Sequence, residues 1–151
     1  MAYIITDACI SCGECTVICA YEAIPVIWTT DHRPLHERTA EYVKGVVDTK
    51  PGKWMYINYV MNVSPQCDCY YWNDAPIVPN IGILASTNPV AIDRASADLV
   101  NRAAPLPGSK IAGRDESKDN LRALYDLPWD YQLEYARRIG LGDDAYDLVE
   151  P

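Results

Sequence analysis

The sequence predicts an α/β fold, with a short mixed sheet flanked by three or four helices and preceded by a small cysteine segment. Two observations predict this organisation. Short apolar runs alternate with stretches whose apolar residues recur at helical spacing. Four of the 6 cysteines lie between Cys9 and Cys19, apart from the remaining two. We therefore expect a cysteine segment at 1–28 and an α/β domain at 29–151, as one compact unit.

The N-terminal part is expected to be mostly extended around one helical turn. Residues 2–5 are apolar and precede a Thr-Asp pair, a pattern typical of a short strand. A helical turn is expected around Cys15 to Cys19, and residues 21–28 are expected to be extended. Residues 29–34 combine Thr, Asp, His, Arg and Pro, which indicates a linker.

A helix is expected from Leu35 to Val47, because the apolar residues in this stretch fall on one helical face. The turn residues at 48–52 would end it. The following run at 54–60 predicts a buried strand. Residues 64–80 carry three prolines, which break any helix and predict a long loop with a function.

The most regular helix signal follows a second expected strand at 81–86. Asn88 and Pro89 supply an N-cap and a first-turn proline for a helix that runs through about Ala103. Apolar residues recur along it at helical spacing, so one face should be buried. Two shorter helices are expected, at 121–125 and 129–139.

The formal net charge of −8 argues against nucleic acid and anionic lipid as partners, because both require clustered Lys and Arg. An acidic surface suits a basic redox partner. No apolar run reaches the length of about 18 residues that a spanning helix needs, and the N-terminus lacks a signal-peptide pattern. The sequence thus predicts a cytoplasmic protein with reduced thiols that bind a metal.

The spacing of Cys9, Cys12, Cys15 and Cys19, C-x2-C-x2-C-x3-C, is the strongest functional signal. It lets three thiolates of one tight loop reach three corners of a cubane cluster. Gly13 allows backbone amides to turn toward the sulfides. Zinc sites usually pair two C-x2-C units across a longer spacer, so the pattern favours one 4Fe-4S cluster.

Residues 2–24 resemble the opening of a bacterial ferredoxin, from the start of the chain through Cys15 and again at Glu22-Ala23-Ile24. The resemblance implies a ferredoxin-like cluster-binding segment and electron transfer. Two features depart from that pattern: Ala20 replaces the proline after the fourth cysteine, and no second three-cysteine run follows. The fourth ligand is therefore open between Cys19 and the distant pair Cys67 and Cys69.

Residues 58–151 resemble the C-terminal half of a family of uncharacterised iron-sulfur centre proteins. The resemblance is carried by Cys67-Asp68-Cys69, Asn73 to Ser86, Asn88 to Asp93 and Tyr131 to Ala136. Members of that family are longer, so the resemblance implies a shortened or chimeric chain. A sheet left incomplete in such a chain would have an exposed edge, and this favours a homodimer.

The function predicted from these patterns is one-electron transfer to or from a redox protein partner, as a carrier rather than a catalyst. Two alternatives remain. The chain could be a binding module with a structural metal or with none, or an enzyme whose cluster acts on a substrate at the loop from Asp68 to Asp74. Asp74 and Asp93 are expected to be solvated or capping groups, and His32 and His36 surface residues.

Overall fold

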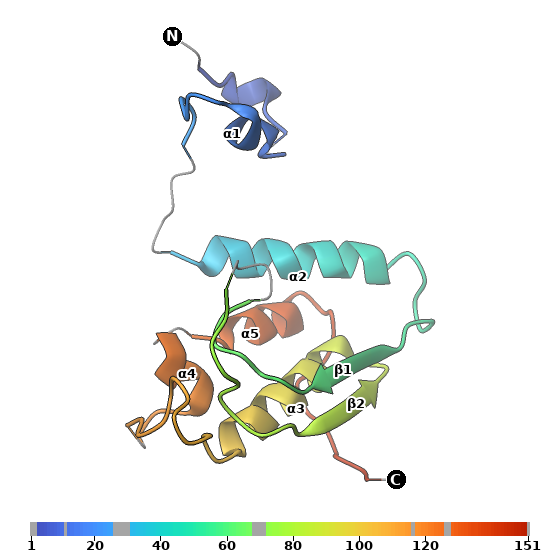
Figure 1. The fold of residues 1–151 in the computed structure, drawn as a ribbon. Coiled ribbons are helices and arrows are strands. Elements are labelled where there is room, and N and C mark those ends of the chain that lie inside the picture. The colour runs from blue at the N-terminus through green and yellow to red at the C-terminus, as the bar shows by residue number, and fades with distance from the viewer. Residues whose placement is uncertain are drawn as a thin grey trace. The chain divides into compact units, whose positions relative to one another are not determined.

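The computed structural model describes residues 3–10, 12–25, 31–67, 72–115, 117–125 and 128–150. The chain divides into two compact units, Met1–His32 and Arg33–Pro151. Figure 1 shows the helices and strands of both units.

The N-terminal unit contains two short helical elements, η1 (Thr6–Ala8) and α1 (Glu14–Ile18). The expected strand at 2–5 is wrong over its described part, because Tyr3–Ile5 pairs with no described strand and the chain turns instead. The backbone N–H of Ala8 donates to the carbonyl of Ile5 at 3.0 Å. Residues 21–25 form turns and bends rather than a strand, and residues 26–28 lie outside the described part of the chain.

The C-terminal unit contains all the longer elements (Figure 1). In chain order they are α2 (Arg33–Val47), β1 (Tyr56–Val60), β2 (Gly82–Ser86), α3 (Pro89–Arg102), α4 (Asn120–Tyr125) and α5 (Tyr131–Arg138). Helix α3 packs against both strands and also contacts α4 and α5, and α2 packs against α5. The expected α/β class is confirmed.

The two strands are antiparallel, with Tyr56 opposite Ser86 and Val60 opposite Gly82. The mixed sheet expected from the sequence is therefore wrong in strand direction. A parallel pair needs a crossover connection, which is usually a helix. The described residues between β1 and β2 form no helix, and the loop expected at 64–80 is confirmed over its described part.

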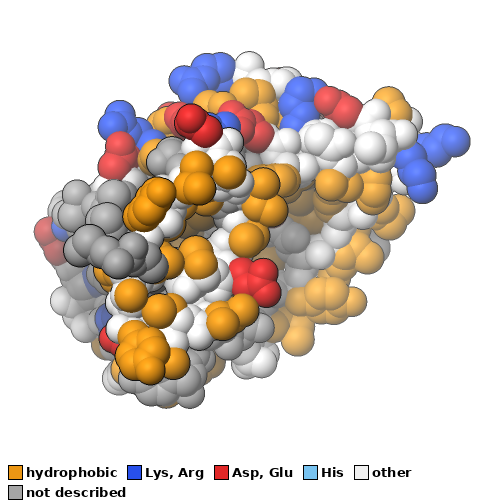
Figure 2. Space-filling model, turned by 90° about the horizontal axis from the view of Figure 1, so that it is seen from above, with side chains coloured by type: hydrophobic (Ala, Val, Ile, Leu, Met, Phe, Trp, Pro, Cys, Tyr) orange, Lys and Arg blue, Asp and Glu red, His pale blue; other side chains and the backbone are white. Residues whose placement is uncertain are grey.

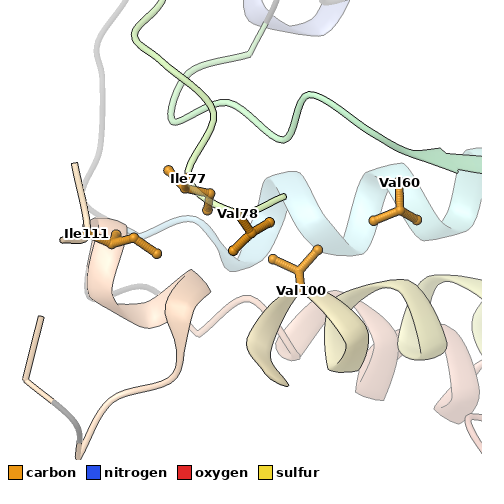
Figure 3. Packing of buried hydrophobic residues seen from close by; sticks show 5 residues of the cluster. All are labelled: Val60, Ile77, Val78, Val100 and Ile111. Atoms are coloured by element: carbon orange, nitrogen blue, oxygen red, sulfur yellow. The ribbon is translucent and has the colours of Figure 1, made fainter. Parts of the chain in front are cut away.

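The loop before β2 contributes directly to the hydrophobic core. Ile77 and Val78 are fully buried there and pack with Val60, Val100 and Ile111 (Figure 3). The N–H of Ile77 donates to the carbonyl of Val63 at 2.8 Å, and its own carbonyl accepts from Leu106 at 2.9 Å. This long loop is thus fixed at its C-terminal end by burial and by backbone hydrogen bonds.

Helix α3 confirms its expected start, because Asn88 accepts hydrogen bonds from the N–H groups of Val90 and Ala91. Its C-terminus is closed by Asn120, a fully buried residue that the sequence analysis did not single out. The Asn120 amide donates to the carbonyls of Val100 at 2.7 Å and Ala103 at 2.8 Å. Both ends of the central helix are therefore satisfied by asparagine side chains.

Within the part of the chain that the structure describes, no helix combines the length and apolar character needed to cross a membrane. Figure 2 shows hydrophobic side chains over much of the face seen from above, with charged groups scattered among them. Exposed apolar residues occur on both units and on both strands.

Candidate functional site

The cysteine loop is shaped by Gly13, which lies immediately before α1. Its φ of 74° is in the left-handed region, where residues with a side chain are strained. The Gly13 carbonyl accepts hydrogen bonds from the N–H of Thr16 at 3.0 Å and from its hydroxyl at 2.7 Å. This turn places Cys12 before the helix and Cys15 on its first turn.

Three of the four expected ligands lie around one hollow. Cys12, Cys15 and Cys19 line an open cavity of about 480 Å³ together with Glu14 and Ile18. Cys19 is the C-cap residue of α1, so the helix itself sets its spacing from Cys15. Cys9 is exposed and is not among the residues that line this hollow.

Cys19 differs from its neighbours in its hydrogen bonding and its exposure. The backbone N–H of Ala23 donates to Cys19 Sγ at 3.3 Å. This hydrogen bond, with a second from Tyr21, lowers the pKa of the Cys19 thiol from its ordinary value. Cys19 is half-buried, whereas Cys9, Cys12 and Cys15 are exposed. The local backbone therefore favours the thiolate form, which is the form that binds iron.

In the described part of the chain, no three His, Cys, Asp or Glu side chains are placed so that they could hold a metal ion. Thiolates that share one zinc ion must lie within about 4 Å of one another, since each Zn–S bond is about 2.3 Å. A cubane cluster spreads its ligands over separate corners and so accepts thiols that line a wide hollow.

The described side chains of the N-terminal unit form no buried core. No described side chain of this unit is buried, and Ile10, Val17 and Tyr21 are 85%, 84% and 92% exposed. Segments shorter than about 40 residues are usually stabilised by a disulfide, a metal or a partner as well as by apolar burial. The described cysteines of the unit form no disulfide.

Cys67 lies in the C-terminal unit, in the loop before β2, and is exposed. Asp68 and Cys69, the other members of that motif, fall outside the described residues. The described part of the loop is organised by Asn73, whose amide donates to the carbonyl of Gln66 at 2.7 Å and to Ser64 Oγ at 2.9 Å. Asn73 is a structural residue of this loop.

Asp74, Asp93 and His36 each contact other groups of the C-terminal unit. Asp74 is exposed and accepts from the N–H of Ala75 at 2.7 Å. Asp93 accepts from the Asn58 amide at 2.8 Å and so ties β1 to α3. His36 lies 3.1 Å from Gln132 Oε1. These contacts hold the fold together, and they form no acid-base pair.

The chain matches a known protein family. The family described as Domain of unknown function (DUF362) matches residues 14–98, which include Cys15, Cys19, Cys67 and Cys69. No curated protein and no solved structure matches the chain. Because the match covers more than half of the sequence, the chain belongs to the DUF362 family.

Proposed function

We propose that the N-terminal unit binds one 4Fe-4S cluster and that the chain transfers single electrons to or from a protein partner. The observation that carries the proposal is that Cys12, Cys15 and Cys19 lie around one hollow, in a unit where no described side chain is buried. Cys9 completes the C-x2-C-x2-C-x3-C spacing. When bound, such a cluster supplies reversible one-electron chemistry.

A bound cluster would supply folding free energy that the described side chains of this unit do not supply by burial. Metal ligation by several thiolates contributes free energy that an unfolded segment lacks, so binding and folding become one process. The exposed apolar residues of the unit cannot supply that energy by burial within the described segment. The exposure of the described apolar side chains of this unit therefore supports the same proposal as the cysteine spacing.

Cys19 is the better candidate for the fourth ligand. It lines the same hollow as Cys12 and Cys15, and the N–H of Ala23 favours its thiolate. Hydrogen bonds from backbone amides to ligand sulfurs also stabilise the reduced, more negative cluster and raise its potential. Cys67 and Cys69 are the rivals, since both belong to the matched family region.

The surface around the hollow suits contact with a protein. Ile18, which lines it, is 67% exposed, and Val17 beside it is 84% exposed. The net charge of −8 adds long-range attraction for a basic partner. We therefore expect association that weakens as ionic strength rises, through a slower on-rate.

The first test is the content of iron and acid-labile sulfide after anaerobic reconstitution of the full chain. We expect about four of each per chain and a visible absorption that bleaches on addition of one electron. A folded chain with zinc but no sulfide would contradict the proposal in favour of a structural-metal module. A folded chain without any metal would contradict it in favour of a metal-free one.

The ligand assignment is tested with two matched variants, Cys19→Ser and the double variant Cys67→Ser/Cys69→Ser. We expect Cys19→Ser to lose cluster iron and the double variant to retain it. The reverse result would assign the fourth ligand to the loop before β2. Far-UV circular dichroism of both variants checks that the C-terminal unit stays folded.

A further inference from the structure

One edge of the two-stranded sheet faces a groove. Among the described strands, β2 pairs with β1 alone, so its second edge has no strand beside it. A cavity of about 350 Å³ is lined by four consecutive residues of β2, which are Ile83, Leu84, Ala85 and Ser86. Consecutive side chains of a strand point to opposite faces, so a cavity lined by all four runs along the backbone edge. The groove therefore presents backbone N–H and C=O groups as well as side chains.

Helix α3 forms the floor of this groove, and the C-terminal tail at 146–149 forms its far wall. The floor consists of three buried residues, Ala91, Ile92 and Ala95. The Tyr146 hydroxyl donates to Asp98 Oδ2 at 3.0 Å and accepts from the Arg102 guanidinium at 2.8 Å. Within the described residues, no backbone hydrogen bond joins the tail to β2. The tail is thus fixed to α3 and leaves the edge of β2 open.

The chemistry of the groove fits an extended peptide. A free strand edge binds another chain in extended form, because alternate residues of the edge offer it an N–H and a C=O. Every second side chain of such a peptide would point toward α3, where Ala91 and Ala95 are small. The volume lies at the low end of the range of about 300–1,000 Å³ for ligand pockets, which suits a short segment.

The charge of the tail favours a basic peptide. Residues 143–150 contain four acidic side chains and no Lys or Arg. Asp144 is paired with Arg137 at 3.3 Å. Asp147 is exposed, and it is the one charged residue among the described residues that line the groove. A Lys or Arg beside Asp147 would gain a partner there, whereas an acidic side chain would be repelled.

The tail also favours a peptide over a second copy of this chain. Pairing of two β2 edges would bring a whole second unit, with its own acidic tail, against the wall at 146–149. A single extended segment needs only the space between β2 and that wall.

We propose that the groove between β2, α3 and residues 146–149 binds an extended basic segment of a partner protein as a third strand of the sheet. Apolar residues of the segment alternate with residues that include a Lys or Arg close to Asp147. A third strand also stabilises a pair of strands that is marginal alone. The proposal is independent of the cluster and of electron transfer.

The test is isothermal titration calorimetry of the full chain with the synthetic peptide Lys-Val-Lys-Val-Lys-Val. The same peptide methylated on its backbone nitrogens should bind at least tenfold more weakly, because it keeps every side chain but loses its N–H donors. The peptide Glu-Val-Glu-Val-Glu-Val should also bind at least tenfold more weakly, because Asp147 repels it.

Two variants of the chain separate the groove from the overall charge. Asp147→Lys should weaken binding of the Lys-Val peptide at least fivefold. Glu134→Lys is the matched control, because it makes the same charge change at an exposed residue of α5 that does not line the groove. It should weaken binding less than twofold.

Hydrogen exchange measured by mass spectrometry locates the peptide, which should slow exchange across residues 83–86 and leave α2 unchanged. Absence of binding by the Lys-Val peptide overturns the proposal. So does equal binding of the methylated peptide, or an equal loss in Asp147→Lys and Glu134→Lys. A chain without peptide that sediments as a dimer and slows its own exchange at 83–86 with rising concentration overturns it in favour of a second copy.

Discussion

The two units of this chain place the same kinds of residue in opposite environments. Ile77 of the C-terminal unit is 0% exposed, whereas Ile10 of the N-terminal unit is 85% exposed. The C-terminal unit is stabilised by a core that β1, α3 and the loop before β2 build together. In the N-terminal unit no described side chain is buried, and the cysteines are exposed or half-buried. Apolar burial stabilises the C-terminal unit, and under the proposed function metal ligation would stabilise the N-terminal unit.

Truncation of a buried isoleucine has the largest expected effect. Ile77→Ala should lower the free energy of unfolding of the C-terminal unit by about 3 kcal/mol, because it leaves a cavity in the core. Val17→Ala in the N-terminal unit should change it by less than about 0.5 kcal/mol. Urea unfolding followed by circular dichroism measures both. Equal losses of unfolding free energy in the two variants would contradict the idea that apolar burial stabilises the C-terminal unit alone.

Removal of the Asn120 amide should have the next largest effect. Asn120→Ala leaves two carbonyls at the end of α3 and the Arg114 guanidinium without this partner, at a cost of about 2 kcal/mol. Asn58→Ala, whose hydrogen bonds to Asp93 and Ser96 lie nearer the surface, should cost less than half as much. Chemical denaturation measures the unfolding free energy of both variants. A loss in Asn58→Ala as large as that in Asn120→Ala would contradict the importance of burial.

A smaller loss is expected at Gly142. A methyl group there would lie 2.2 Å from Asn88 Oδ1, the atom that caps α3. Gly142→Ala must displace the cap and should cost about 1 kcal/mol in thermal unfolding. Gly45→Ala is the control, since a methyl group at Gly45 meets no atom within 4 Å. An unchanged melting temperature for Gly142→Ala would show that the cap tolerates movement.

The smallest expected effect concerns the link between α2 and α5. The hydrogen bond to Glu41 raises the pKa of Tyr135 above its ordinary value, and the bond to Glu37 does the same for Tyr131. These two hydrogen bonds stabilise the fold fully below the ordinary tyrosine pKa. Their contribution is lost as the pH rises through the raised pKa of each tyrosine. Glu41→Gln should lower the pKa of Tyr135 alone, as NMR titration of the ring signals can show. A shift in Tyr131 instead would contradict the pairing.

Much of the C-terminal unit could be predicted from the sequence because its signals are local. Asn88 and Pro89 mark the start of α3 through cap chemistry that involves only the next few residues. The role of Asn120 could not be predicted in this way. Its partners lie 17 and 20 residues away and meet it only after the chain has folded.

The structure of the N-terminal unit could be predicted only in part. The apolar residues at 2–5 have the pattern of a strand, but a strand also needs a neighbour for its backbone groups, and none of the described strands pairs with Tyr3–Ile5. The cysteine spacing was more informative, because C-x2-C and the following helical turn bring Cys12, Cys15 and Cys19 around one hollow. The apolar residues of this segment gave no sign in the sequence that they would be exposed in the structure.

Backbone hydrogen exchange, measured by mass spectrometry with and without iron, tests the central claim most directly. Reconstitution should slow exchange across residues 3–25 by at least tenfold and leave residues 33–150 unchanged, because only the N-terminal unit depends on ligation. Equal protection of residues 3–25 in the iron-free chain would contradict the account. In that case the N-terminal unit would fold without a cluster, and its cysteines would need another explanation.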